Sequence, residues 1–131
     1  MRWNWPVDRK LIRQVTALST PFPGFYGKKV GAIAATEDGE VLSFGYNQSV
    51  HKSKKTSILC AVESMVQMAL REHKSLYGSI VYLTEPPCAA TAKAIWEVGA
   101  CRVVCPQKNN LYRATATRLL AKLGVTITKY S

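Results

Sequence analysis

The second half of the chain alternates short strand-like segments with helical segments, and this alternation limits the fold more than any other feature. The strand-like segments, 79–84, 101–105 and 125–130, are rich in β-branched and aromatic residues. The segments between them, 88–98 and 111–123, have helical patterns, and each is followed by a glycine of the kind that ends helices. Strands that alternate with helices predict parallel neighbours in one sheet, with helices packed on its faces.

The first half adds a helix, a hairpin and a second helix. Apolar residues recur at helical spacing over about 8–19. The segment 30–47 predicts two strands joined by a tight turn at Asp38-Gly39. The segment 57–72 is apolar nearly all round, as a buried helix is. We therefore expect an α/β fold, a three-layer α/β/α sandwich around a mixed five-stranded sheet.

The chain has 131 residues, with no linker and no internal repeat, so we expect one domain over 1–131. No long apolar run predicts a membrane span. The start, "MRWNWPVDRK", has charges where a signal peptide needs an apolar region, so we predict an intracellular, cytoplasmic protein. In that setting we expect reduced thiols rather than a disulfide framework at the four cysteines, Cys60, Cys88, Cys101 and Cys105.

The charge of the chain is strongly basic, at +10, and it is uneven. No acidic residue follows Glu97, whereas six basic ones do: Arg102, Lys108, Arg113, Arg118, Lys122 and Lys129. A second cluster lies in the polar loop 48–56. Either these residues attract phosphate on a nucleotide, a nucleic acid or an acidic protein, or they form a solvated basic face. The candidates for phosphate or nucleic-acid contacts are Lys52, Lys54, Lys55, Arg113, Arg118 and Lys122.

Two segments, "CAVESMVQMAL" at 60–70 and "TEPPCAATAKAI" at 84–95, each place one cysteine near the start of a predicted helix. Zinc-dependent nucleobase deaminases carry an H-x-E or C-x-E motif followed by P-C-x-x-C. The three His or Cys side chains of these motifs hold Zn²⁺ and leave one position for water. The metal lowers the pKa of that water, and the glutamate transfers its proton to the base.

On these residues the chain resembles the cytidine/deoxycytidylate deaminase superfamily, and within it the deoxycytidylate and tRNA-adenosine deaminase branch. The blocks 28–47, 60–70 and 78–105 occur in the order of that family. The resemblance implies a cytidine deaminase-like fold over roughly 28–131. It also implies a ligand pocket in which Asn47 matches a position that contacts the sugar of a nucleotide, and in which Gly31 and Ala32 belong to the floor strand.

The catalytic positions depart from the family pattern. Cys60 and Cys88 match the first two zinc ligands, but Thr91 stands where the third is expected, and Val62 stands where the glutamate is expected. Loss of a general acid/base typically costs about 10²–10⁴-fold in rate. A neutral hydroxyl is a poor zinc ligand beside thiolates or imidazoles. We therefore interpret Cys60, Cys88 and Thr91 as vestigial metal positions, and expect no zinc, no other cofactor and no catalytic residue.

Two nearby residues could in principle replace what is missing. Glu63 lies one residue past the required position, and one residue rotates a helical side chain by about 100°, away from the site. His51 lies in a loop without the usual ligand spacing. Cys101 and Cys105 are expected on one face of a strand, about 13 Å apart, too far to share a metal. They are expected to be buried as small apolar residues.

The leading hypothesis is a catalytically inactive deaminase-fold protein that acts by binding. At Val62 the chain resembles the non-catalytic subunit of the eukaryotic tRNA adenosine deaminase, although that subunit keeps its metal ligands. The implied partners are a second copy, another deaminase-fold chain or a larger assembly, together with a nucleic acid or nucleotide, and no membrane. The alternative is an active zinc-dependent deoxycytidylate deaminase with a non-standard site. A third class is a small-molecule sensor or a pure protein-binding module.

Overall fold

The computed structural model describes residues 5–25, 27–47, 56–108 and 111–131. Its helices and strands follow the predicted order, with bounds within a few residues of those expected. They are α1 (Trp5–Leu18), β1 (Gly31–Ala35), β2 (Val41–Tyr46), α2 (Ser57–Arg71), β3 (Ile80–Leu83), α3 (Ala89–Glu97), β4 (Arg102–Pro106), α4 (Leu111–Lys122) and β5 (Thr126–Tyr130).

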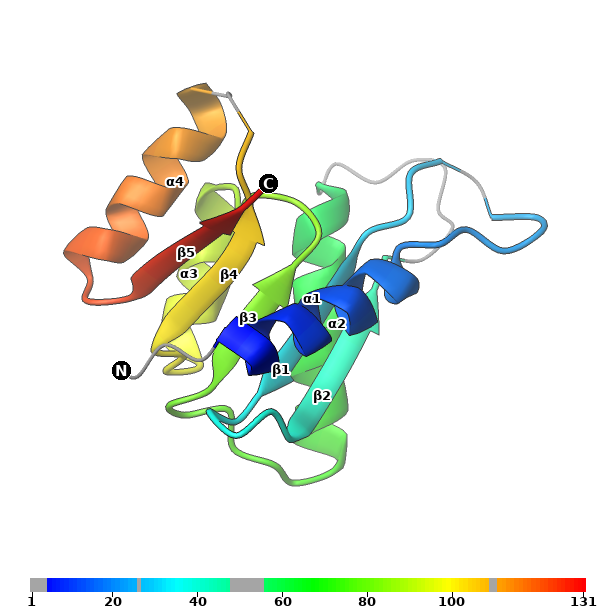
Figure 1. Cartoon of the computed structure of the whole chain (residues 1–131), viewed down its shortest axis with the longest axis horizontal. Coiled ribbons are helices and arrows are strands. Elements are labelled where there is room, and N and C mark those ends of the chain that lie inside the picture. The colour runs from blue at the N-terminus through cyan, green and yellow to red at the C-terminus, as the bar shows by residue number, and fades with distance from the viewer. Residues whose placement is uncertain (1–4, 26, 48–55, 109–110) are drawn as a thin grey trace.

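The five strands form one mixed sheet in the order β2-β1-β3-β4-β5. β1 pairs antiparallel with β2 and β3, whereas β3, β4 and β5 run parallel to one another. Helix α1 lies on one face of the sheet, and α2, α3 and α4 cover the other (Figure 1). The predicted three-layer α/β/α sandwich with a mixed five-stranded sheet is therefore confirmed.

The predicted hairpin is also confirmed, with its turn placed one residue earlier than expected. The N–H of Gly39 donates to the carbonyl of Thr36 at 3.0 Å, so the centre of the turn is Glu37-Asp38. Gly39 follows it with a φ of +92°, a left-handed conformation that favours glycine. The register shifts between Ala34 and Ala35, which pair with Ser43 and Val41, so β2 has one extra residue, Leu42, at a bulge.

The core is divided by the sheet into two clusters of unequal size. The larger cluster packs α2, α3 and α4 on the sheet and includes Val62, Met65, Ile95 and Leu120. The smaller cluster lies under α1, whose main contacts are with β1 and β3. Among the described residues, α1 is the one helix on this face, and its main strand contacts do not include the outer strand β5. None of the described helices is long and apolar enough to cross a membrane.

A buried ion pair joins α1 to the sheet. Asp8 and Arg102 are each only 1% exposed, and the guanidinium contacts both carboxylate oxygens, one of them at 3.0 Å. The hydroxyl of Tyr82 donates to Asp8 Oδ1 at 2.7 Å, and Arg102 Nε donates to Thr128 Oγ1 at 3.0 Å. Both charges are therefore paired and hydrogen-bonded, as burial requires. The prediction that Arg102 belongs to a basic surface is wrong, because its guanidinium neutralises Asp8 inside the protein.

The four cysteines are free thiols. Cys105 is fully buried in the larger core cluster, as predicted, and burial raises the pKa of its thiol to about 11. Cys101 precedes β4, packs against the smaller cluster and donates to the carbonyl of Gly78 at 3.1 Å. The prediction that the two cysteines share one face of a strand is therefore wrong, because Cys101 lies outside the regular strand and packs on the other side of the sheet.

We predict that Asp8→Asn lowers the free energy of unfolding by about 3–5 kcal/mol, because it leaves the buried Arg102 charge without a counterion. The double variant Asp8→Leu/Arg102→Met replaces the pair with apolar groups. We expect it to lower the free energy of unfolding by less than Asp8→Asn does. Urea unfolding followed by circular dichroism measures both changes. The exposed Lys10 on the same helix provides the control, and Lys10→Ala is expected to change stability by less than about 0.5 kcal/mol. Equal stability of Asp8→Asn and Lys10→Ala would contradict the assignment.

Candidate functional site

The two cysteine segments meet where α2 and α3 begin. Thr56 is the N-cap of α2, and its Oγ1 accepts a hydrogen bond from the N–H of Leu59 at 3.2 Å. Cys88 is the N-cap of α3 and has an extended backbone. The Oγ1 of Thr56 lies 3.3 Å from the Sγ of Cys88. This contact brings together the starts of two helices that are 32 residues apart in the sequence.

Cys88 lies at the centre of this site. Its side chain is 2% exposed, and its Sγ lies 3.1 Å from Thr91 Oγ1 in the first turn of α3. Burial alone would raise the pKa of the Cys88 thiol. Hydrogen bonds with Thr56 and Thr91, together with the nearby charge of Arg113, outweigh burial and hold this pKa below its ordinary value. The site therefore favours a thiolate at Cys88 more than an ordinary buried position does.

The remaining positions of the two motifs provide few metal-ligating groups. Thr91 and Val62 are both completely buried, so Val62 presents only hydrocarbon to the core. Cys60 is half-buried, one turn into α2, and its N–H donates to the carbonyl of Thr56 at 3.1 Å. Within the described residues, no group of three or more His, Cys, Asp or Glu is placed to hold a metal ion. Two thiols and a neutral threonine hydroxyl do not fit a catalytic zinc centre, which has three protein ligands drawn from Cys, His, Asp and Glu.

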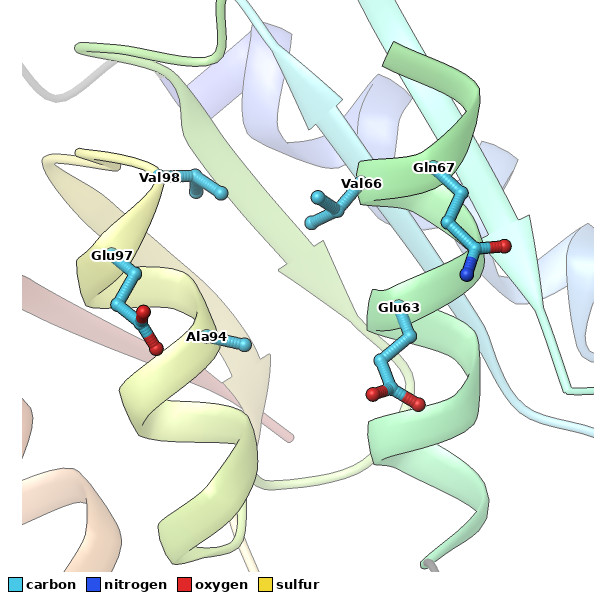
Figure 2. A pocket seen from close by; sticks show the side chains of 6 residues that line it. All are labelled: Glu63, Val66, Gln67, Ala94, Glu97 and Val98. Atoms are coloured by element: carbon cyan, nitrogen blue, oxygen red, sulfur yellow. The ribbon is translucent and has the colours of Figure 1, made fainter. Parts of the chain in front are cut away.

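Glu63 contributes to a different surface. With Glu97 it lines a groove of about 340 Å³ between α2 and α3; Figure 2 shows Glu63 on α2 and Glu97 on the neighbouring α3. Val66, Ala94 and Val98 form the apolar part of that groove. Glu63 therefore belongs to this groove rather than to the Cys88–Thr91 site. His51 lies outside the described residues.

The three residues assigned to a ligand pocket have specific structural surroundings. Asn47 is 6% exposed; its Oδ1 accepts from the N–H of Val30, and its Nδ2 donates to the carbonyl of Lys28, both at 2.7 Å. This amide thus fixes the segment that enters β1. A Cβ on Gly31 would lie 2.8 Å from Leu18 Cβ, so its open side faces α1. Ala32 is fully buried on the other face, beneath α2.

The predicted cationic contacts are dispersed in the structure. Arg113 is half-buried, and its guanidinium donates to the carbonyl of Pro86, just before Cys88. Arg118 and Lys122 are exposed on α4, and Arg118 Nε donates to the carbonyl of Ala114 at 3.4 Å. The three loop cations, Lys52, Lys54 and Lys55, lie outside the described residues.

Sequence analysis missed Thr56 and Glu85. Thr56 directly precedes an apolar helix, and that position is a known signal for an N-cap. Glu85 accepts from Lys108 Nζ at 2.7 Å and forms an ion pair with Lys28. Burial would raise the pKa of Glu85, but the hydrogen bonds from Lys108 and Lys28 outweigh it and lower this pKa. No local pattern reveals Glu85, because its partners lie far away in the sequence.

Comparison with known proteins bears on the family and the fold of the chain. The family model for the cytidine and deoxycytidylate deaminase zinc-binding region matches residues 7–107. The dCMP deaminase of the cyanophage S-TIM5 superposes with a TM-score of 0.75 at 20% identity, covering 98% of this chain and 100% of that one. The guanine deaminase from Nitrosomonas europaea gives 0.64 at 13% identity, with 98% and 78% covered. No curated protein matches the sequence.

A larger bifunctional enzyme contains the same fold as one part. It is the diaminohydroxyphosphoribosylaminopyrimidine deaminase/5-amino-6-(5-phosphoribosylamino)uracil reductase from Thermotoga maritima, with a TM-score of 0.73 at 17% identity. The superposition covers 95% of this chain and 36% of that one, so this chain spans about a third of its length. At such identities the structural likeness shows a shared fold. The family model, which matches most of the sequence, shows that the chain belongs to the cytidine and deoxycytidylate deaminase family.

Proposed function

We propose that this chain is a catalytically inactive member of its family, a single domain over 1–131 that acts as a binding, regulatory or structural subunit. The observation that carries the proposal is the 3.1 Å contact between Thr91 Oγ1 and Cys88 Sγ. A hydroxyl stands where the P-C-x-x-C motif supplies its second cysteine, and it is hydrogen-bonded to the first. This arrangement satisfies the two buried groups without a metal.

The environment of Val62 supports the same proposal. In the H-x-E or C-x-E motif, the glutamate must reach the bound water and the base, which requires a side chain at the site. Val62 instead packs in the larger core cluster and is completely buried. Together, a missing ligand and a missing general acid/base remove both the activated water and the group that moves its proton. Binding without turnover is the function that remains for this scaffold.

Zinc content and ammonia release test this proposal directly. We expect the purified chain to contain far less than one zinc per chain and to release no ammonia from dCMP, because the described donor set lacks a third ligand. Thr91→Cys is expected to raise the zinc content, and Val62→Glu in that background supplies the missing carboxylate. Near-equimolar zinc in the wild type together with ammonia release would establish an active zinc-dependent deaminase with a non-standard site, and would refute the proposal.

A thiol titration tests the contact between Thr91 and Cys88. Thr91→Val keeps the side-chain shape but removes the hydroxyl, so we expect it to raise the pKa of Cys88. The ultraviolet absorbance of the thiolate, followed with pH, measures this pKa, and Cys88→Ser identifies its share of the signal. Because the folded pKa is depressed, the thiolate contributes stability above the unfolded pKa, and this contribution is lost as pH falls through the folded value. An unchanged pKa in Thr91→Val would contradict the assigned contact.

We further infer a protein partner on the helical face, with a second copy of this chain as the first candidate and another deaminase-fold chain or a larger assembly as the next. Trp96 on α3 and Leu70 on α2 are 49% and 68% exposed, although both are large and apolar. Exposed apolar groups that cluster on one face indicate interaction surfaces, and tryptophan is enriched in them. The exposed Arg118 and Lys122 on α4 support the additional proposal of a nucleic acid or nucleotide partner.

Sedimentation velocity tests the protein partner. We expect the wild-type chain to form dimers or larger assemblies at micromolar concentration, and Trp96→Asp to shift it toward monomers, because a charge at a buried interface is costly. Phe22→Asp provides a matched control, since Phe22 is an aromatic residue of similar exposure, 48%, outside the helices. A wild-type chain that stays monomeric would argue against self-association.

A further inference from the structure

A second pocket lies on the opposite face of the sheet, where α1 passes the outer strand β5. It has a volume of about 370 Å³. Its lining comes from both elements and includes Trp5, Arg9, Ile12, Arg13, Lys129 and Tyr130. The Cys88–Thr91 site lies among the helices of the other face, and the two sites share no residue. This pocket is therefore separate from the ligand pocket that the family resemblance implies.

The uneven coverage of the sheet explains why this pocket exists. α1 is the only described helix on its face, and its main contacts are with β1 and β3. β5 lies at the edge of the sheet, two strands beyond β3. The side of α1 that faces β5 therefore has no second helix beside it, and its side chains form one wall of an open pocket.

The charge of the pocket is positive. Arg9 and Arg13 lie one helical turn apart on α1, and both are exposed. Lys129 borders the pocket on β5, but its neighbour Tyr130 packs on the α1 face, and Lys129 also lines a pocket beside Cys105 on the helical face. No Asp or Glu side chain is among the described lining residues. The nearest acidic residue along α1, Asp8, is buried and neutralised by Arg102. Like charges held this close repel one another, and a bound anion relieves that repulsion.

An aromatic surface accompanies these cations. Trp5 is 38% exposed, and the guanidinium carbon of Arg9 lies 5.4 Å from the centroid of its ring. The hydroxyl of Tyr130 donates to the carbonyl of Leu83 at 2.7 Å, which fixes the ring at the base of the pocket. In proteins that bind single strands, aromatic rings and Arg guanidinium groups stack on the bases. Cations beside them contact the phosphates of the nucleic acid.

We propose that this pocket binds a nucleotide unit, with its phosphate held by Arg9 and Arg13 and its base stacked on Trp5. The inference rests on the proposed binding function and gives it a location. It moves the main nucleic-acid contact from the exposed cations of α4 to the opposite face of the sheet. A nucleotide unit is the shared chemistry of a free mononucleotide and of a single strand, and the experiment distinguishes these two sources.

Fluorescence anisotropy of a labelled single-stranded oligonucleotide measures binding by the full chain. We expect Arg9→Glu/Arg13→Glu to weaken affinity by about tenfold or more, because both cations contact phosphate in the proposed complex. The matched control, Arg118→Glu/Lys122→Glu, changes the net charge equally on α4 and is expected to weaken it much less. Trp5→Ala is expected to weaken binding by about fivefold or more through loss of stacking. Arg13→Gln provides a milder pocket variant, and circular dichroism verifies the fold of each.

The outcomes separate this inference from the proposed function. The proposed pocket would be overturned if the pocket and α4 double variants lost affinity equally, or if only the α4 double variant lost affinity. Either result would leave the proposal of binding without turnover intact. If the wild type bound neither the oligonucleotide nor a mononucleotide, the proposed nucleotide pocket would also be overturned. Ammonia release from dCMP would refute the proposed function independently. Displacement of the oligonucleotide by a mononucleotide would identify a single-nucleotide ligand, whereas pocket-dependent binding without displacement would identify a strand.

Discussion

The buried pair of Asp8 and Arg102 is the interaction on which the layered arrangement depends. It joins α1 to β4, and its hydrogen bonds extend to Tyr82 on β3 and Thr128 on β5. Removing one partner leaves a buried charge, so the pair constrains the position of α1 more than it adds net stability. Because α1 is held over the middle of the sheet, the outer strand stays uncovered on that face. The basic pocket beside β5 is a consequence of this placement.

The site at the starts of α2 and α3 depends on a different kind of interaction. Two threonine hydroxyls and one buried thiol satisfy one another there, and Arg113 donates to the carbonyl of Pro86, two residues before the thiol. A metal centre would need deprotonated or imidazole ligands at these positions and a carboxylate beside them. The chain has the fold of the family, while Val62 and Thr91 occupy two positions of the catalytic motifs and are both completely buried.

The two faces of the sheet differ in composition and in what they can bind. The helical face carries exposed apolar side chains beside a groove lined by Glu63 and Glu97. The α1 face carries Arg9 and Arg13 beside the aromatic side chains of Trp5 and Tyr130. A protein partner on the first face and a nucleotide on the second would not compete for the same surface. The two proposed partners could therefore bind at the same time.

The sequence by itself determined the order of the elements, the sheet of mixed strands and the family, because alternating apolar periods and the two cysteine motifs are local patterns. It also identified Val62 and Thr91 as departures, since a motif position is read directly from spacing. Only the tertiary structure decided which charges are available. Arg102 belongs to the same basic tail as Arg118, yet one is buried against Asp8 and the other is exposed. The free energy of a charge depends on partners that are distant in the sequence, and folding alone brings those partners together.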